Sequence, residues 1–162
     1  MTAIDSGRTI GHARRLAEAG DLEHAASILA DLAADASAPE QAEAALGLSV
    51  VVERMAQRLL AEGEPGQAAD ALLRALAVGQ VADMGRLRVL LGLAHLDMAC
   101  AEFAEAVREG PDADTGALAI ELLARTLPLR GRDTDAEAVW DYGLSHPDEV
   151  LAEQVRLRIA RD

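Results

Sequence analysis

The chain of 162 residues carries a formal net charge of −13, and 51% of it is hydrophobic although only 2% is aromatic. Such a core has to be built from alanine, leucine and valine, which favours close-packed helices over a β-sandwich. The acidic excess argues against binding to nucleic acid or to an anionic membrane surface, because both are polyanionic.

Apolar periodicity and the positions of glycine and proline predict an all-α protein. Residues 1–8 are expected to form a flexible N-terminal tail. Residues 9–162 are expected to form a single domain, because no linker is long enough to divide them. In chain order, helices are predicted near residues 9–19, 22–35, 39–62, 65–79, 84–98, 101–109, 115–130, 134–144 and 147–161.

Three glycines, Gly20, Gly63 and Gly131, stand in the same local pattern, with Ala and Leu before them and Ala and a large apolar residue after them. A glycine with left-handed backbone ends a helix at low steric cost. Each of the three therefore predicts the turn of a helical hairpin. The residues expected to start the second helices are Asp21 and Asp133, as N-caps, and Pro65, in a first turn.

The spacing of these glycines predicts further units. Gly63 and Gly131 are separated by twice the period of roughly 34 residues that one helical repeat has. One more hairpin is therefore expected between them, with its turn near residues 97–99. Gly20 and Gly63 lie further apart than one period, and the excess is expected to lengthen the helix near residues 39–62.

Several residues recur from one predicted hairpin to the next: Leu46-Gly47 and Leu91-Gly92 in first helices, Ala136 and Trp140 in a second helix followed by Pro147, and the weaker pairs Ala25 with Leu29 and Ala68 with Leu72. These residues resemble the pattern of the tetratricopeptide repeat (TPR) family. The resemblance implies a right-handed α-solenoid of stacked antiparallel hairpins, here about four degenerate hairpins and a C-terminal capping helix. It also implies that first helices line a concave groove for a partner.

The last predicted helix, over residues 147–161, is amphipathic. Its apolar residues are expected to cover the end of the stack, because a terminal repeat has to shield the core from water. The loop over residues 108–116 is expected to be the most flexible link. The apolar side of the helix is predicted to comprise Val150, Leu151, Val155 and Ile159.

The sequence contains no motif for catalysis or metal binding. Its four histidines lack the spacing of a helical zinc site, and the segments from Asp112 and Asp133 lack the glycine and glutamate of a calcium loop. Cys100, the only cysteine, excludes an intrachain disulfide and is expected to be a buried apolar residue. We therefore expect a protein that is not an enzyme and uses no metal, cofactor or catalytic residue.

The cellular location is predicted from the absence of targeting features. The first residues lack the apolar run of a signal peptide. No stretch is long and apolar enough for a membrane span. A cytoplasmic protein is therefore expected.

The leading functional hypothesis is a scaffold or adaptor that binds a protein or peptide in the groove. Arginine pairs well with carboxylates, so a peptide with acidic and apolar features suits such a surface. These side chains are alternatively ordinary solvated positions. The groove residues predicted from the register are Arg14, Arg15, Glu18, Glu53, Arg54, Gln57, Arg86, Val89, Leu93, Asp97, Glu121 and Arg125.

Two other hypotheses remain open. The first is a self-associating structural subunit, for example a homodimer. In it, the long helix near residues 39–62 pairs with its symmetry mate. The second is a small-ligand-binding or enzymatic protein with a pocket in the helical stack. The apolar helix near residues 84–98 is either central core or the floor of a groove.

Overall fold

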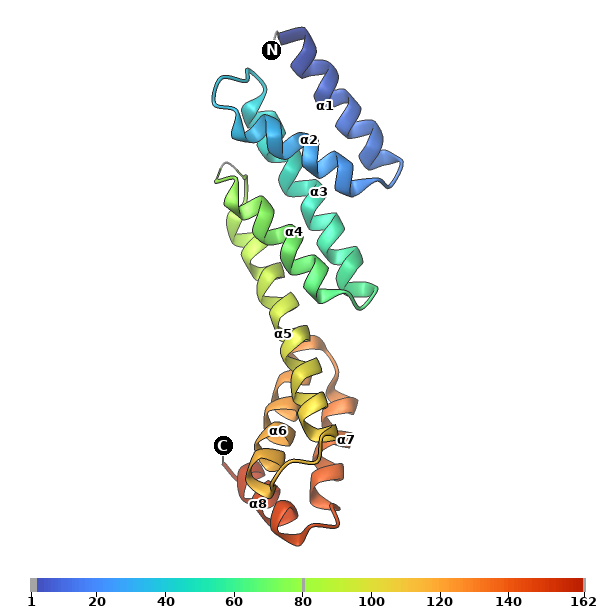
Figure 1. Ribbon diagram of the computed structural model, residues 1–162, viewed down its shortest axis with the longest axis vertical. Helices are drawn as coiled ribbons and strands as arrows, with labels where there is room; N and C mark the ends of the chain where they lie inside the picture. Colours follow the sequence, from blue (N-terminus) through green and yellow to red (C-terminus); the bar gives the residue numbers. More distant parts are fainter. Residues whose placement is uncertain (1–2, 80, 162) are drawn as a thin grey trace. The chain divides into compact units, whose positions relative to one another are not determined.

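The computed structural model describes residues 3–79 and 81–161, with side chains described from Thr9 onward, and within these ranges all regular structure is helical (Figure 1). The predicted all-α class is confirmed. The elements are α1 (Ala3–Glu18), α2 (Leu22–Ala34), α3 (Gln41–Ala61), α4 (Pro65–Ala77), α5 (Met84–Arg108), α6 (Ala113–Thr126), the 3-10 helix η1 (Leu127–Arg130), α7 (Asp133–Leu144) and α8 (Glu149–Ile159).

The three predicted hairpin turns are present. Gly20, Gly63 and Gly131 have φ angles of 88°, 78° and 70°, which lie in the left-handed region that a side chain disfavours. Asp21 caps α2 by accepting a hydrogen bond from the backbone N–H of His24, and α4 starts at Pro65. The prediction for Asp133 was wrong by one position, because the N-cap of α7 is Arg132.

One predicted hairpin is absent. Helix α5 runs without a break from Met84 to Arg108, through residues 97–99 where a turn was expected. No glycine or proline lies between Gly92 and Gly110, and alanine, leucine, methionine and glutamate in this segment are strong helix formers. The chain turns only at Gly110, where φ is 63°.

The ends of two other helices also differ from expectation. Helix α1 begins at Ala3, so residues 3–8 of the predicted tail are helical, while residues 1–2 lie outside the described residues. The predicted helix over residues 115–130 is divided into α6 and η1. Pro128 accounts for this division, because its nitrogen cannot donate the hydrogen bond of an α-helix.

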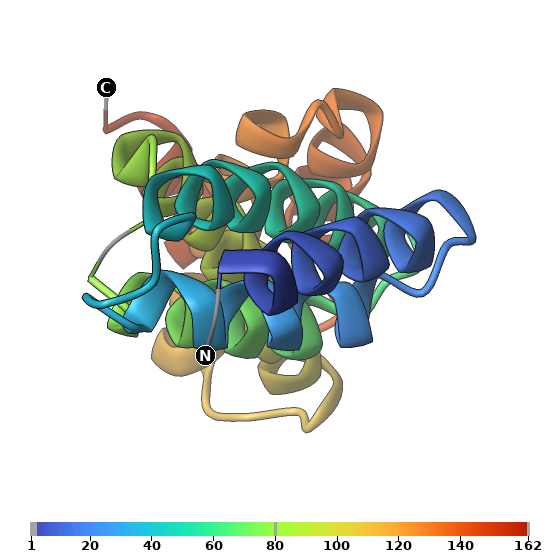
Figure 2. The ribbon, with the colours of Figure 1, turned by 90° about the horizontal axis from the view of Figure 1, so that it is seen from above.

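Contacts group the chain into two compact units, Met1–His95 (unit 1) and Leu96–Asp162 (unit 2). In unit 1, helices α1 to α4 pack in chain order, each against the next, and α1, α2 and α3 lie side by side in Figures 1 and 2. The fully buried Leu48, Val52 and Leu72 form the centre of this packing. The single domain over residues 9–162 stays a prediction.

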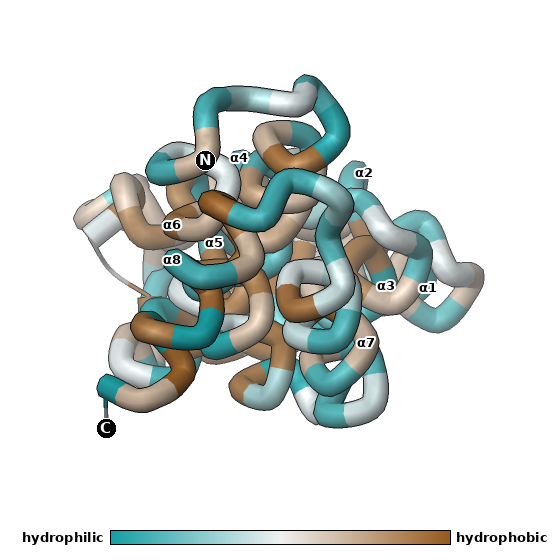
Figure 3. The backbone as a smooth tube through the Cα atoms, turned by 90° about the horizontal axis from the view of Figure 1, so that it is seen from below, coloured by the Kyte–Doolittle hydropathy of each residue, from teal (hydrophilic) through white to brown (hydrophobic). Residues whose placement is uncertain are grey.

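Unit 2 holds the last part of α5 together with α6, η1, α7 and α8, and hydrophobic and hydrophilic positions are interleaved along α6 and α8 (Figure 3). Its core has two clusters. Cys100, buried as predicted, packs with Leu123 and Leu127, and burial raises the pKa of its thiol. The second cluster joins α6 to α8 through Ala117, Ile120, Leu151 and Val155.

The apolar side of α8 agrees with the sequence in part. Leu151 and Val155 are buried, and Ile159 packs against their cluster. Val150, however, is 62% exposed, so its predicted place on the covered side was wrong. A helix turns about 100° per residue, so the side that contains Leu151 and Val155 leaves Val150 at its edge.

Candidate functional site

The predicted groove residues of unit 1 lie on α1, α3 and α5, and several are joined by ion pairs within the chain. Arg14 of α1 pairs with Glu43 of α3 at 3.4 Å. Arg86 of α5 donates from Nε to Oε1 of Glu53 at 2.9 Å. Gln57 also donates to that Glu53 oxygen, at 3.2 Å. The structure thus brings Glu53, Gln57 and Arg86 together, with their polar groups already satisfied by one another.

The other predicted residues of unit 1 have different surroundings. Arg15, Glu18 and Arg54 are exposed, and within the described part of the chain their side chains make no ion pair. Val89 is 65% exposed, whereas Leu93, on the same helix, is half-buried.

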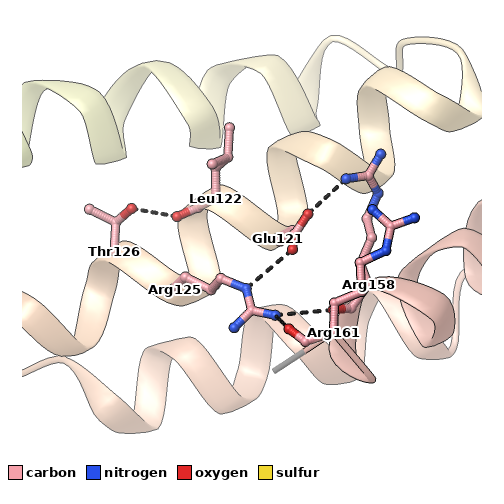
Figure 4. Close-up of polar contacts among 6 residues, drawn as sticks. All are labelled: Glu121, Leu122, Arg125, Thr126, Arg158 and Arg161. Atoms are coloured by element: carbon pink, nitrogen blue, oxygen red, sulfur yellow. Dashed lines mark hydrogen bonds and ion pairs between the residues drawn. The ribbon is translucent and has the colours of Figure 1, made fainter.

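The predicted residues of unit 2 are also engaged internally. Asp97 accepts two hydrogen bonds from Arg130, at 2.6 and 3.1 Å. Glu121 lies between two arginines (Figure 4) and accepts from Arg158 at 2.7 Å and from Arg125 at 3.2 Å. Burial by itself raises the pKa of Glu121, but these two hydrogen bonds outweigh it and the pKa is lowered.

Arg125 has a structural position at the end of α8. Its Nη2 donates to the carbonyl oxygens of Arg158 and Arg161, both at 3.0 Å. The Arg158 carbonyl belongs to the last turn of α8, where intrahelical donors run out, and Arg161 lies just beyond the C-cap Ala160. Its guanidinium also lies 5.8 Å from the ring centre of Trp140. Arg125 therefore fastens α8 to α6.

A cleft that the sequence did not predict lies in unit 1, between α2 and α4. These helices lie on the same side of α3 (Figure 1) and each packs against α3. The space between them has a volume of about 470 Å³. We call it the α2–α4 cleft. It is lined by Glu23, His24, Ala26, Ser27, Ala30 and Asp31 of α2, by Leu48, Val52 and Met55 of α3, and by Ala71, Arg74 and Ala75 of α4.

The floor and walls of the α2–α4 cleft have the spacing of helix packing. Leu48, Val52 and Met55 follow one another at four and three residues, so they form one apolar stripe along α3. Each wall contributes two alanines one turn apart: Ala26 and Ala30 on α2, and Ala71 and Ala75 on α4. Small side chains allow another backbone to approach closely.

The rim of the α2–α4 cleft carries charges that are not compensated within the chain. Glu23 and Asp31 on α2 and Arg74 on α4 form no ion pair with any other described residue. His24 differs, because its Nδ1 lies 2.8 Å from Oδ2 of Asp21. That hydrogen bond raises the pKa of His24 and lowers the pKa of Asp21. The cleft is therefore more acidic along α2 than along α4.

None of the predicted groove residues lines the α2–α4 cleft. The prediction placed the groove on first helices, as the TPR resemblance implies, whereas the cleft lies between two second helices. The sequence nonetheless contains the patterns that form this cleft, namely the alanine pairs on α2 and α4 and the apolar stripe on α3. Most of these residues are buried, so the packing expected of them is present, and periodicity does not show the opening that remains above them.

The described residues contain no group of three or more histidine, cysteine, aspartate or glutamate side chains placed to hold a metal ion. Among them, too, no helix has the length and apolar character needed to cross a membrane. Comparison with protein-family models, with curated proteins and with solved structures gave no match.

Proposed function

We propose that the protein is a non-enzymatic interaction module that binds an amphipathic α-helix of a partner protein in the α2–α4 cleft. The observation that carries this proposal is the set of charges at the rim without an ion-pair partner among the described residues, on Glu23, Asp31 and Arg74. The floor below them is formed by apolar residues that are themselves buried in the packing of unit 1. In the predicted groove, by contrast, Glu53 is paired with Arg86, although Arg15, Glu18 and Arg54 have no ion-pair partner in the described part of the chain. A side chain that needs no internal partner is available to an external one.

The shape of the cleft suits a helix. An amphipathic helix binds a groove through apolar residues three and four positions apart, and the stripe of Leu48, Val52 and Met55 has the same spacing. The alanines of both walls permit close contact between backbones. Two carboxylates face one arginine across the rim, so a partner helix with basic residues beside its apolar seam complements the cleft best.

We also propose that the helices follow TPR-type repeats. Hydrogen bonds between residues 33 positions apart support this, because they join Ser49 to the carbonyl of Ala82, Arg86 to Glu53, Arg130 to Asp97, and Arg125 to the carbonyl of Arg158. This separation is close to the repeat period of roughly 34 residues. In this proposal the binding surface lies on second helices.

Two synthetic helical peptides with the same apolar seam test the proposed function, one with lysine and the other with glutamate beside the seam. We expect the lysine peptide to bind about three- to tenfold more tightly, as measured by fluorescence anisotropy, because each exposed charge pair contributes up to about 1 kcal/mol. Replacing both Glu23 and Asp31 by their amides is expected to remove this preference.

A second test blocks the cleft with a larger side chain and compares this variant with a matched control. Ala30→Leu fills the cleft from α2, whereas Ala34→Leu lies one turn further along the same helix and outside the cleft. Binding should be lost in the first variant and kept in the second, with unchanged helical circular dichroism in both. Equal binding of the two variants, or of the two peptides, would contradict the proposal.

Self-association is the second candidate, and we propose α3 as its surface. Leu46 and Val50 lie one turn apart on this helix and are 59% and 51% exposed. Two such helices from two copies can bury these residues against each other. Sedimentation equilibrium distinguishes this candidate: a dimer should dissociate when Leu46→Glu and Val50→Glu are combined, and a wild-type protein that is monomeric at high concentration excludes it.

A further inference from the structure

A second cavity lies wholly within unit 2, and neither the predicted groove nor the α2–α4 cleft includes it. It has a volume of about 660 Å³, within the range of roughly 300–1,000 Å³ that small-molecule sites have. The last turns of α5, the loop before α6, α6 itself, α7 and the start of α8 all contribute lining residues. We call it the unit 2 cavity.

The interior of the unit 2 cavity is apolar and is not filled by the chain's own side chains. Ile120, Leu123 and Leu151 lie at its base and are buried. At other lining positions the residues are small, as at Ala104 and Ala138. Ala104 is half-buried and Ala138 is exposed at the opening, so a leucine would narrow the space at the first position and cover its opening at the second.

The mouth of the cavity offers two hydrogen-bond donors. Nδ1 of His146 accepts the backbone N–H of Asp148 at 3.1 Å, so Nε2 is the ring nitrogen that is left to donate. The ring of Tyr142 lies edge-on to this imidazole, with ring centres 5.6 Å apart. The phenol hydroxyl has no hydrogen-bond partner within the described residues.

The charged groups at the mouth already have hydrogen-bond partners within the chain. Arg108 donates from Nε to Glu105 at 3.0 Å. The carboxylate of Asp148 accepts the backbone N–H groups of Val150 at 2.9 Å and Leu151 at 3.4 Å. Acidic residues also outnumber arginines in unit 2, which disfavours an anion. Both charged groups at this mouth are therefore already engaged, Arg108 by the carboxylate of Glu105 and Asp148 by the N-terminus of α8.

From these features we infer that the unit 2 cavity binds a small uncharged apolar molecule carrying a hydrogen-bond acceptor, such as the carbonyl group of a ketone, ester or amide. The apolar body occupies the space above Ile120, Leu123 and Leu151. The acceptor lies at the mouth and receives hydrogen bonds from Tyr142 and His146. This site is independent of helix binding in the α2–α4 cleft.

Titration of the full chain with prodan, an uncharged fluorescent naphthyl ketone, tests this inference. We expect saturable binding of one molecule per chain with a blue-shifted emission. Ala138→Leu should weaken binding at least tenfold because the leucine covers the opening of the cavity. Ala101→Leu, at an exposed alanine on α5 outside the cavity, should leave binding unchanged. Ala30→Leu in the other cleft should also have no effect.

Two further variants test the donors. Tyr142→Phe removes only the hydroxyl, and His146→Asn keeps an acceptor for the N–H of Asp148 while it removes the Nε2 donor. Each should lower prodan affinity about fivefold, which corresponds to one lost hydrogen bond. In the wild-type protein, methyl NMR should show that prodan shifts the resonances of Ile120, Leu123 and Leu151. This measurement does not depend on whether the variants fold.

Three results would overturn the inference. The first is prodan binding that does not saturate or that Ala138→Leu leaves unchanged. The second is saturable binding of the anionic dye 8-anilinonaphthalene-1-sulfonate at this site with no binding of prodan. The third is methyl shifts confined to residues of unit 1, which would place the prodan in the α2–α4 cleft.

Discussion

Arg86 donates a hydrogen bond from Nε to Oε1 of Glu53 at 2.9 Å and thereby joins α5 to α3 across 33 positions of the sequence. Both residues were predicted to face a partner. Their pairing gives them a role inside the chain, and Arg14 with Glu43 is a second pair of this kind. Some residues of first helices thus hold neighbouring helices together, whereas Glu23, Asp31 and Arg74 along the α2–α4 cleft have no ion-pair partner among the described residues.

The Glu121 cluster should contribute more to stability than the Glu53 pair. The Glu121 side chain is 15% exposed and accepts from two arginines, whereas Arg86 is largely exposed to water. We expect Glu121→Gln to lower the free energy of unfolding by about 1–3 kcal/mol and Glu53→Gln by less than about 1 kcal/mol. Urea denaturation at neutral pH measures both.

The effect of Glu121→Gln should also depend on pH. The pKa of Glu121 is lowered in the folded state. Its contribution to the free energy of unfolding is therefore complete above the unfolded-state pKa of about 4.3, and it is lost as pH falls through the lower folded-state pKa. The two proteins should therefore converge in stability at acidic pH. A difference that grows on acidification would show that the carboxylate is not the stabilising form.

Two glycine substitutions should have opposite effects. A Cβ at Gly143 would lie 3.0 Å from both Val155 methyl groups and 3.1 Å from Ile120, so Gly143→Ala should destabilise unit 2 by about 1–3 kcal/mol. A Cβ at Gly92, within α5, meets no atom within 4 Å, and Gly92→Ala should stabilise by about 0.5–1 kcal/mol. Thermal unfolding followed by circular dichroism measures both, and equal signs would contradict the packing.

Local features of the fold were predictable because their causes lie within a few residues. The turns at Gly20, Gly63 and Gly131 need a left-handed backbone, which glycine adopts at little cost. The missing hairpin near residues 97–99 was predicted from the repeat period instead. No local breaker supports that turn, so helix propensity prevailed and α5 continued to Arg108.

The binding surfaces were less predictable because they depend on which sides of the helices remain uncovered. Charged residues such as Glu53 and Asp97 were candidates for partner binding, but both are half-buried. Their partners Arg86 and Arg130 lie 33 positions away, and helix packing brings them together. The unit 2 cavity needs residues from four helices, and no short motif records such a combination.

The continuity of α5 can be tested with proline. Ala99→Pro places a proline in the interior of the observed helix and should destabilise the protein by about 3 kcal/mol. Ala113→Pro is the matched control, because Ala113 is the first residue of α6 and the preceding Asp112 has an extended backbone that suits a following proline. If the two variants unfold at the same urea concentration, residues 97–99 form a turn and not a helix.

The hydrogen bond between Asp21 and His24 should be visible in the titration of His24. Asp21→Asn keeps a side-chain acceptor for the N-terminus of α2 but removes the carboxylate that raises the pKa of His24. We expect the pKa of His24 to fall toward its usual value in this variant, as measured by NMR. Asp35→Asn alters an aspartate at the other end of α2, whose side chain accepts from Ser37, and should leave the pKa of His24 unchanged.

The direction of the pH dependence of stability follows from the same pair. The pKa of His24 is raised in the folded state. Its contribution to the free energy of unfolding is therefore complete below the unfolded-state pKa of about 6.5, and it is lost as pH rises through the folded-state pKa. The lowered pKa of Asp21 makes its contribution complete above about 3.9, and this is lost as pH falls through the folded value. Asp21→Asn should therefore lower stability most between about pH 4 and pH 6.5. A loss that is larger at pH 9 than at pH 5 would show that the cap, and not the ion pair, is the main contribution of Asp21.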